Sequence, residues 1–196
     1  MNFKLLFVVL LSTASLASNA QNRWGLRTGL NFDMAGIGLN EAVATTQSIF
    51  EGAASDDGYH IGFYGRQFIG DQWYFSSTAL YIKNSKFISG SNGSTLMYES
   101  FDHNLIQIEL CTGIRLLKFA RGEAGVHYQQ HLSDNAFTAT FAPSSAGYNI
   151  GLGVDLWKLG IDMTYYSNFQ NHTGDWNGIP LSYNRSQLLI GLTAKL

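Results

Sequence analysis

The segment GYNIGLGVDLWKLGIDMTYY, residues 147–166, decides the fold. Its large side chains recur at every second position on both sides of Trp157-Lys158, with glycine or polar residues between most of them. Alternation with a period of two is typical of β-strands that have two unlike faces. The segment therefore predicts a β-hairpin, with strands at 147–156 and 159–166 joined by a two-residue turn.

The same alternation recurs along the rest of the chain. It predicts six further strands, at residues 24–33, 59–68, 73–83, 105–116, 123–129 and 187–196. In the segment 73–83 both faces carry aromatic residues, and we place on the apolar face Trp73, Phe75, Ala79 and Tyr81. The total is eight strands, and no stretch after residue 20 has the apolar length of a membrane-spanning helix.

The connections between these strands differ in length in a regular way. Long segments at 34–58, 84–104, 130–146 and 167–186 alternate with short ones at 69–72, 117–122 and 157–158. Membrane barrels have short turns at one end and long loops at the other, and an even strand count puts both termini at the short-turn end. The predicted fold class is all-β, an eight-stranded antiparallel up-and-down transmembrane β-barrel.

The size of the interior indicates which face of each strand points into the barrel and which points outward. An eight-stranded barrel is just wide enough inside for side chains, and apolar faces turned inward on every strand would overfill it. We therefore expect the apolar face to contact lipid and the face with glycine and charged residues to line the lumen. Aromatic residues near strand ends then fall where membrane-interface girdles are expected: Trp24, Phe32, Tyr59, Trp73, Tyr81, Tyr128, Tyr148 and Tyr165.

Composition narrows the class of protein. The chain has 196 residues, enough for one domain of ordinary size. Only 13% of residues are charged, and 12 basic residues are scattered against 14 acidic ones, so no nucleic-acid partner is expected. A hydrophobic share of 45% argues against a disordered chain.

The first twenty residues are typical of a secretory signal peptide. Lys4 precedes an apolar run at residues 5–11, and small residues lead to Ala20. We expect cleavage before Gln21, which leaves one outer-membrane β-barrel domain at residues 21–196. A retained membrane anchor is the alternative, although the apolar run is shorter than the roughly 20 residues that span a bilayer. Cys111 is the only cysteine, so the chain forms no internal disulfide.

Several short motifs resemble a known family. The segment GLRTGLNF, residues 25–32, is similar to the opening strand of the PorT-like outer-membrane β-barrel family of Bacteroidota. Further correspondences are GYHIGFY at 58–64, GLGVDL at 151–156 and the pair Tyr165-Tyr166. The chain departs from the family at QIE, residues 107–109, where Glu-Ile-Pro is usual, and at Leu196, where an aromatic residue is common. The resemblance implies an outer-membrane barrel and, for some relatives, a part in secretion.

Patterns for catalysis or metal binding are weak. Glu123, His127 and His131 are an even number of positions apart and so lie on the same face of a strand. Residues four apart on a strand are separated by about 13 Å, however, and cannot ligate one ion by themselves. A Ser-His-Asp hydrolase of the lipid-modifying type has no local motif here such as Gly-x-Ser-x-Gly. We therefore expect no catalytic residue, no metal site and no cofactor.

Charged residues on the predicted lumen face form the candidate site. They are four basic and four acidic side chains: Arg27, Arg66, Arg115 and Lys195, with Glu109, Glu123, Asp155 and Asp162. An unpaired charge in a narrow interior is costly, whereas a paired one is tolerable. We expect a structural network of ion pairs and hydrogen bonds that plugs the barrel. The alternative is a conducting or proton-linked pore, for which an eight-stranded interior leaves little width.

The expected function follows from this architecture. We expect an integral protein of the cell outer membrane that is a structural, interaction or secretion-associated component, and neither an enzyme nor an open pore. The expected partners are outer-membrane lipid, the barrel-assembly machinery during insertion, and a protein bound through the long loops. Candidate loop contacts are Phe50, Tyr98, Trp176 and Tyr183. The alternatives are a soluble periplasmic barrel that binds lipid or a small ligand, and a lipid-modifying outer-membrane enzyme.

Overall fold

The computed structural model describes residues 22–34, 37–39, 58–91, 96–132, 143–170, 172–176, 179–183 and 186–196. Eight strands form a closed barrel: β1 (Asn22–Asp33), β3 (Gly58–Ile69), β4 (Trp73–Ser91), β5 (Leu96–Arg115), β6 (Ala120–His131), β7 (Ser144–Leu156), β8 (Leu159–Asn168) and β11 (Ser186–Lys195). Three short strands form a separate sheet: β2 (Ile37–Leu39), β9 (His172–Trp176) and β10 (Ile179–Tyr183). The predicted all-β class and the eight-stranded barrel are confirmed.

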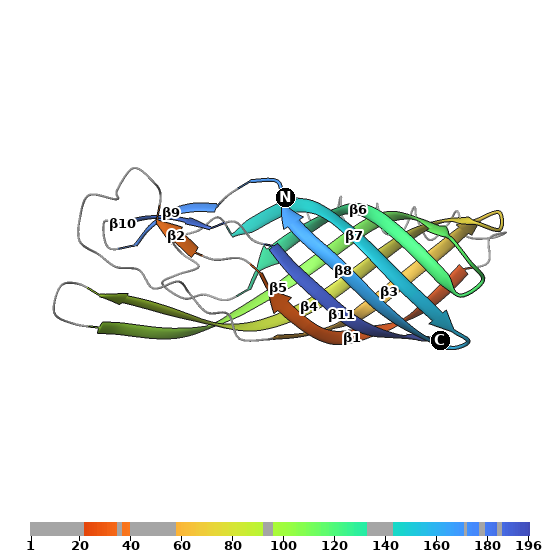
Figure 1. The fold of residues 1–196 in the computed structure, drawn as a ribbon, viewed down its shortest axis with the longest axis horizontal. Coiled ribbons are helices and arrows are strands. Elements are labelled where there is room, and N and C mark those ends of the chain that lie inside the picture. The colour runs from red at the N-terminus through yellow and green to blue at the C-terminus, as the bar shows by residue number, and fades with distance from the viewer. Residues whose placement is uncertain are drawn as a thin grey trace.

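The barrel strands pair with their neighbours in the chain, and β11 lies between β8 and β1 and closes the circle (Figure 1). All these pairs are antiparallel. The turns at 70–72, 116–119 and 157–158 lie at the same end as the start of β1 and the end of β11, where Gly25 pairs with Lys195. Gly70 has φ of 68°, a left-handed conformation that favours glycine. We call this the short-turn end.

Several segments expected as loops contain strands. Most of 84–104 is a β-hairpin, because the pairing of Lys83 with Asn104 continues without a break to that of Ser91 with Leu96. Segments 34–58 and 167–186 contribute β2, β9 and β10. These strands have only three to five residues, too few for alternation to identify them, so the sequence pattern did not predict them. The expected signal peptide at residues 1–20 lies outside the described residues.

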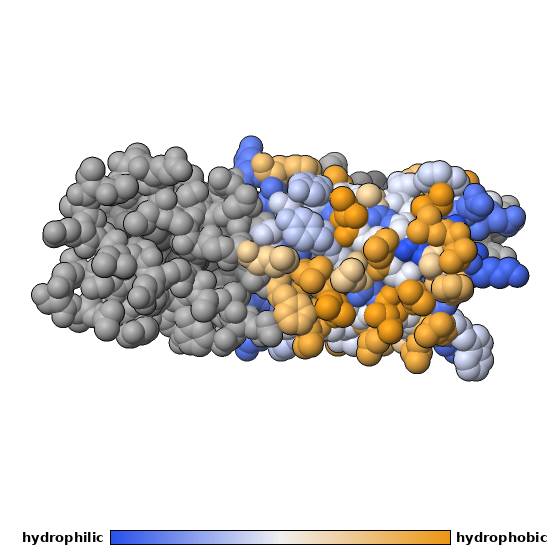
Figure 2. Space-filling model, viewed as in Figure 1, coloured by the Kyte–Doolittle hydropathy of each residue, from blue (hydrophilic) through white to orange (hydrophobic). Residues whose placement is uncertain are grey.

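An apolar belt surrounds the barrel. Phe63, Ile150 and Leu192 point outward and are 64%, 57% and 59% exposed, and Figure 2 shows apolar side chains gathered over the barrel strands on the face in view. The arrangement expected for a soluble barrel, with the apolar faces turned inward, is therefore not the one that the described strands adopt. No helix among the described residues is long and apolar enough to cross a membrane.

Small and large side chains complement each other in the lumen. A Cβ added at Gly153 would collide with the guanidinium of Arg121, and one added at Gly113 would collide with the ring of Tyr74. These glycines therefore give space to long side chains from neighbouring strands. Nearer the long loops the lumen also holds an apolar cluster, contrary to the expected lining of glycine and charged residues. Its members are at most 1% exposed: Leu80, Ile82, Leu105, Tyr166 and Leu189.

Candidate functional site in the barrel lumen

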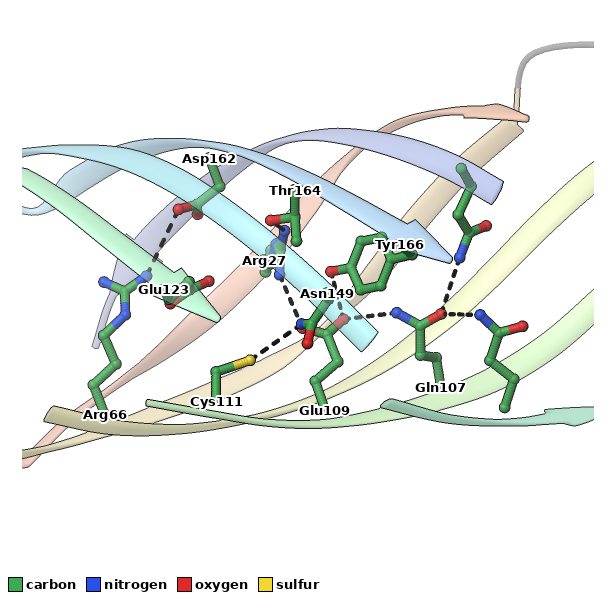
Figure 3. Close-up of polar contacts among 12 residues, drawn as sticks. Arg27, Arg66, Gln107, Glu109, Cys111, Glu123, Asn149, Asp162, Thr164 and Tyr166 are labelled. Atoms are coloured by element: carbon green, nitrogen blue, oxygen red, sulfur yellow. Dashed lines mark hydrogen bonds and ion pairs between the residues drawn. The ribbon is translucent and has the colours of Figure 1, made fainter. Parts of the chain in front are cut away.

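Glu109 on β5 is the centre of a buried polar network. Its Oε2 accepts a hydrogen bond from Arg27 at 3.4 Å, and its Oε1 accepts hydrogen bonds from Tyr166 and Gln107, both at 2.8 Å (Figure 3). Arg27 on β1 also donates to Thr164 on β8 at 2.8 Å. Glu109 is 1% exposed and Arg27 is 3% exposed, so the two charges are held together away from bulk water.

A layer of three glutamines lies next to this ion pair, toward the long loops. Oε1 of Gln107 accepts hydrogen bonds from Gln129 on β6 at 2.8 Å and from Gln187 on β11 at 3.0 Å. All three side chains are fully buried. Because β5 and β11 are four positions apart in the circle of eight strands, the bond from Gln187 crosses the full width of the lumen. The glutamine layer therefore joins opposite walls of the barrel.

A second charged group lies toward the short-turn end. Arg66 on β3 contacts Asp155 on β7 at 3.4 Å and Asp162 on β8 at 3.8 Å. Arg121 on β6 pairs with the same two carboxylates, through Nε to Asp155 at 3.8 Å and through Nη2 to Asp162. β3 and β7 are also opposite each other in the circle. Two arginines and two aspartates thus form a cross-barrel cluster.

Arg121 was not among the lumen charges predicted from the sequence. The segment 117–122 was expected as a turn, whereas β6 already begins at Ala120. Arg121 shares the parity of Glu123 and is 4% exposed. Extending the alternation of 123–129 backward by two residues would have placed Arg121 in the lumen, so the signal was present in the sequence.

The structure places the other predicted charges on the lumen face but in different surroundings. Glu123 accepts a hydrogen bond from Tyr74 at 3.2 Å. The Arg115 guanidinium carbon lies 4.4 Å from the ring centre of Phe68. Lys195 donates to the backbone carbonyl of Trp157 at 2.8 Å. Of the eight predicted residues, the structure joins five in ion pairs: Arg27, Arg66, Glu109, Asp155 and Asp162.

The polar side chains with metal-ligand chemistry are dispersed. His127 lies 3.4 Å from Oδ1 of Asn168, through Nε2, and meets the ring of Tyr166 edge-on. Cys111 is buried and accepts a hydrogen bond from Asn149 at 3.1 Å. Within the described ranges, no three His, Cys, Asp or Glu side chains come together in a way that could hold a metal ion. Of the candidate loop contacts, Phe50 lies outside the described residues, and the side chains of Tyr98, Trp176 and Tyr183 are not described.

Comparison with known proteins identifies the type of fold. No protein-family model and no curated protein matches the chain. The outer membrane protein OprG from Pseudomonas aeruginosa matches with a TM-score of 0.55 and 13% sequence identity, over 90% of this chain and 97% of OprG. AlkL matches with a TM-score of 0.47 and 12% identity, over 89% of this chain and 91% of AlkL. Outer Membrane Protein W of E. coli matches with a TM-score of 0.41 and 13% identity, over 91% of this chain and all of that chain.

The likeness to OprG shows that this chain has the fold of an outer-membrane β-barrel. This fold and the apolar belt agree with the expected location in the cell outer membrane.

Proposed function

We propose that this protein is an integral outer-membrane barrel whose lumen is closed by its own side chains, so that it acts as a structural or interaction component and not as an open pore. The observation that carries the proposal is the hydrogen bond from Gln187 to Gln107, which joins opposite strands through fully buried side chains. A continuous aqueous channel requires a lumen that side chains do not bridge.

Two further layers support the closed lumen. The apolar cluster around Leu105 and Leu189 lies beside the glutamines, where Leu80 is the register partner of Gln107 and Tyr166 that of Gln187. The cross-barrel cluster that joins Arg66 to Asp155 and Asp162 lies toward the short-turn end. An ion passing through would have to displace buried apolar side chains, the neutral glutamines and a compensated charge cluster, and moving a charge through such surroundings costs several kcal/mol.

Planar-bilayer recording tests the closed lumen. The barrel is refolded in detergent, its folding is checked by the change in gel mobility on heating, and it is inserted into a planar lipid bilayer. We expect no stable conductance from the native chain. Regular current steps that scale with salt concentration would contradict the proposal, provided that the same preparation is folded. The variant Gln107→Ala with Gln187→Ala, which removes the bridge between opposite walls, is the comparison that shows whether this layer contributes to closure.

Interaction through the long-loop end is the second part of the proposal. The ladder of β4 and β5 continues to Ser91 and Leu96, so this hairpin extends well past the strands beside it (Figure 1). Rigid barrels commonly carry specific binding on such extensions. We infer a protein partner at this end, with outer-membrane lipid around the belt and the barrel-assembly machinery as a partner during insertion. The role is not enzymatic.

A relation to the PorT-like barrels of Bacteroidota, and with it a part in secretion, rests on the residues that resemble that family. The segment 25–32 forms most of β1, which is consistent with its place as an opening strand. Deleting the gene in its own host and comparing the secreted proteins tests this part. Unchanged secretion would contradict a part in secretion but would leave the proposal of a closed barrel intact.

A further inference from the structure

Four arginines meet on the lumen face at the short-turn end. Arg23 is the register partner of Arg66 across β1 and β3, and Arg115 is the partner of Arg121 across β5 and β6. Like charges directly opposite each other on neighbouring strands destabilise a sheet. Arg66 and Arg121 are buried, whereas Arg23 and Arg115 are partly exposed. We call the first two the inner arginines and the last two the outer arginines.

Among the described residues, carboxylates form direct ion pairs with the inner arginines, while Asp155 acts on Arg23 only at longer range. Asp155 and Asp162 pair with both of them. None of the ion pairs among the described residues involves Arg23 or Arg115. Moreover, Nη2 of Arg115 is buried and has no hydrogen-bond partner in the described part of the chain. A buried guanidinium nitrogen without an acceptor is costly, so the folded barrel gains free energy if an acceptor binds there.

The lumen face at this end also has an excess of positive charge. The basic side chains are the four arginines and Lys195, and the acidic ones are Glu123, Asp155 and Asp162. Five cations against three anions leave two positive charges uncompensated. Asp71 in the turn between β3 and β4 and the C-terminal residue Leu196 are both exposed, so water screens their carboxylates and this count leaves them out.

Phe68 on β3 holds the two outer arginines on one ring. The guanidinium carbon of Arg23 lies 4.7 Å from the ring centre, and that of Arg115 lies 4.4 Å from it. A guanidinium stacked on an aromatic ring keeps its N–H edge free for hydrogen bonds. The two guanidinium groups therefore lie against the same ring, at the partly exposed end of the lumen.

We propose that the short-turn end of the lumen is an anion-binding site, in which Arg23 and Arg115 bind an oxyanion of the phosphate class. The forked donors of guanidinium match the oxygens of phosphate, and the excess of two positive charges matches a phosphate monoester dianion. Short turns of outer-membrane barrels face the periplasm. The oxyanion therefore belongs to a soluble phosphate compound or to the headgroup of a lipid in the periplasmic leaflet, which share this chemistry.

Titration with inorganic phosphate tests the soluble source. The full chain is refolded in an uncharged detergent, and binding is measured by calorimetry against sodium chloride of equal ionic strength. We expect saturable binding that weakens about tenfold or more in Arg23→Gln and in Arg115→Gln. Arg115→Lys keeps the charge and loses the fork, so its affinity should lie between. Lys118→Gln and Lys158→Gln remove one charge each from exposed residues of the turns at the same end, and they should bind like the native chain.

Lipid vesicles test the headgroup source. The barrel is inserted into phosphatidylcholine vesicles that contain either brominated phosphatidic acid or brominated phosphatidylcholine. Stronger quenching of tryptophan fluorescence by the phosphatidic acid, lost in Arg23→Gln and in Arg115→Gln, assigns the site to a lipid phosphate. Binding in the calorimetric arm alone assigns it to a soluble phosphate compound. The proposal is overturned if neither arm shows saturable binding, or if folded Arg23→Gln and Arg115→Gln variants bind as well as the native chain.

Discussion

The ion pair of Arg27 with Glu109 gives the sharpest prediction about stability. Arg27→Met leaves the Glu109 carboxylate, 1% exposed, with hydrogen bonds from Gln107 and Tyr166 only. Removing one partner of a buried pair costs about 3–5 kcal/mol, and the two remaining donors place this variant near the lower limit. Glu109→Gln leaves the Arg27 charge with Thr164 as its remaining acceptor, so we expect about 4 kcal/mol.

The double variant distinguishes charge from shape. In Arg27→Met with Glu109→Gln both charges are gone, while the glutamine oxygen can still accept from Gln107 and Tyr166. We expect the double variant to lose only about 1–2 kcal/mol, less than either single variant, because no unpaired charge is left buried. Urea unfolding of the barrel in phospholipid vesicles, followed by tryptophan fluorescence, measures the free energy of unfolding of each variant.

Lys158→Met is the matched control, because it removes a cation of similar length from an exposed turn and should change stability by less than about 0.5 kcal/mol. The reasoning is refuted if the losses of the two single variants add up in the double variant to within about 0.5 kcal/mol, since additivity means that the two charges do not interact. It is equally refuted if both single variants are as stable as the control.

Three further predictions concern the lumen glycines, the belt and the thiol. Gly153→Ala should lower the urea midpoint of unfolding markedly, because the added Cβ collides with Arg121. The control Gly122→Ala meets no atom closer than 3.7 Å and should leave the midpoint unchanged. Equal midpoints for the two variants would contradict the close approach of Arg121 to Gly153. Phe63→Arg puts a charge in the middle of the apolar belt and should lower the free energy of unfolding in vesicles by about 2–4 kcal/mol, measured by the same unfolding curve. A change near zero would mean that this face of the barrel does not contact lipid. Cys111 is 5% exposed, so its thiol should resist maleimide in the folded barrel and react fully in urea, as followed by mass spectrometry. Rapid labelling before unfolding would show that the lumen is open to water.

Much of the barrel could be predicted because lipid imposes a simple rule. A strand between lipid and a polar lumen must alternate, and the segments around Leu192 and Ile150 do so, apart from Leu189 on the lumen face. Outside the segments that contact lipid on one face, alternation is not required, and strands there were not predicted. The outer parts of β4 and β5 lie beyond the alternating segments, so the sequence of 84–104 resembles a loop although it pairs as a hairpin.

The partners within the lumen could not be predicted in the same way. Alternation along each strand places Arg66 and Asp155 on the lumen face. It does not indicate which residues of β3 and β7 lie at the same level along the barrel axis. That level depends on the stagger that accumulates around the closed circle of strands. Glu123 shows the consequence, because it was expected to face a cation and instead accepts a hydrogen bond from the hydroxyl of Tyr74.

Charge along the lumen axis connects the two proposals. On β5 the inward residues run from neutral Gln107 through Glu109, whose charge Arg27 compensates, to Arg115 at the short-turn end. Among the described lumen residues, positive charge is therefore in excess at the short-turn end, and the layers behind it are neutral or compensated. A conducting anion pathway would need favourable positions along its whole length, not at one end. If both proposals hold, an oxyanion at the outer arginines is retained at the periplasmic end and does not pass through the barrel.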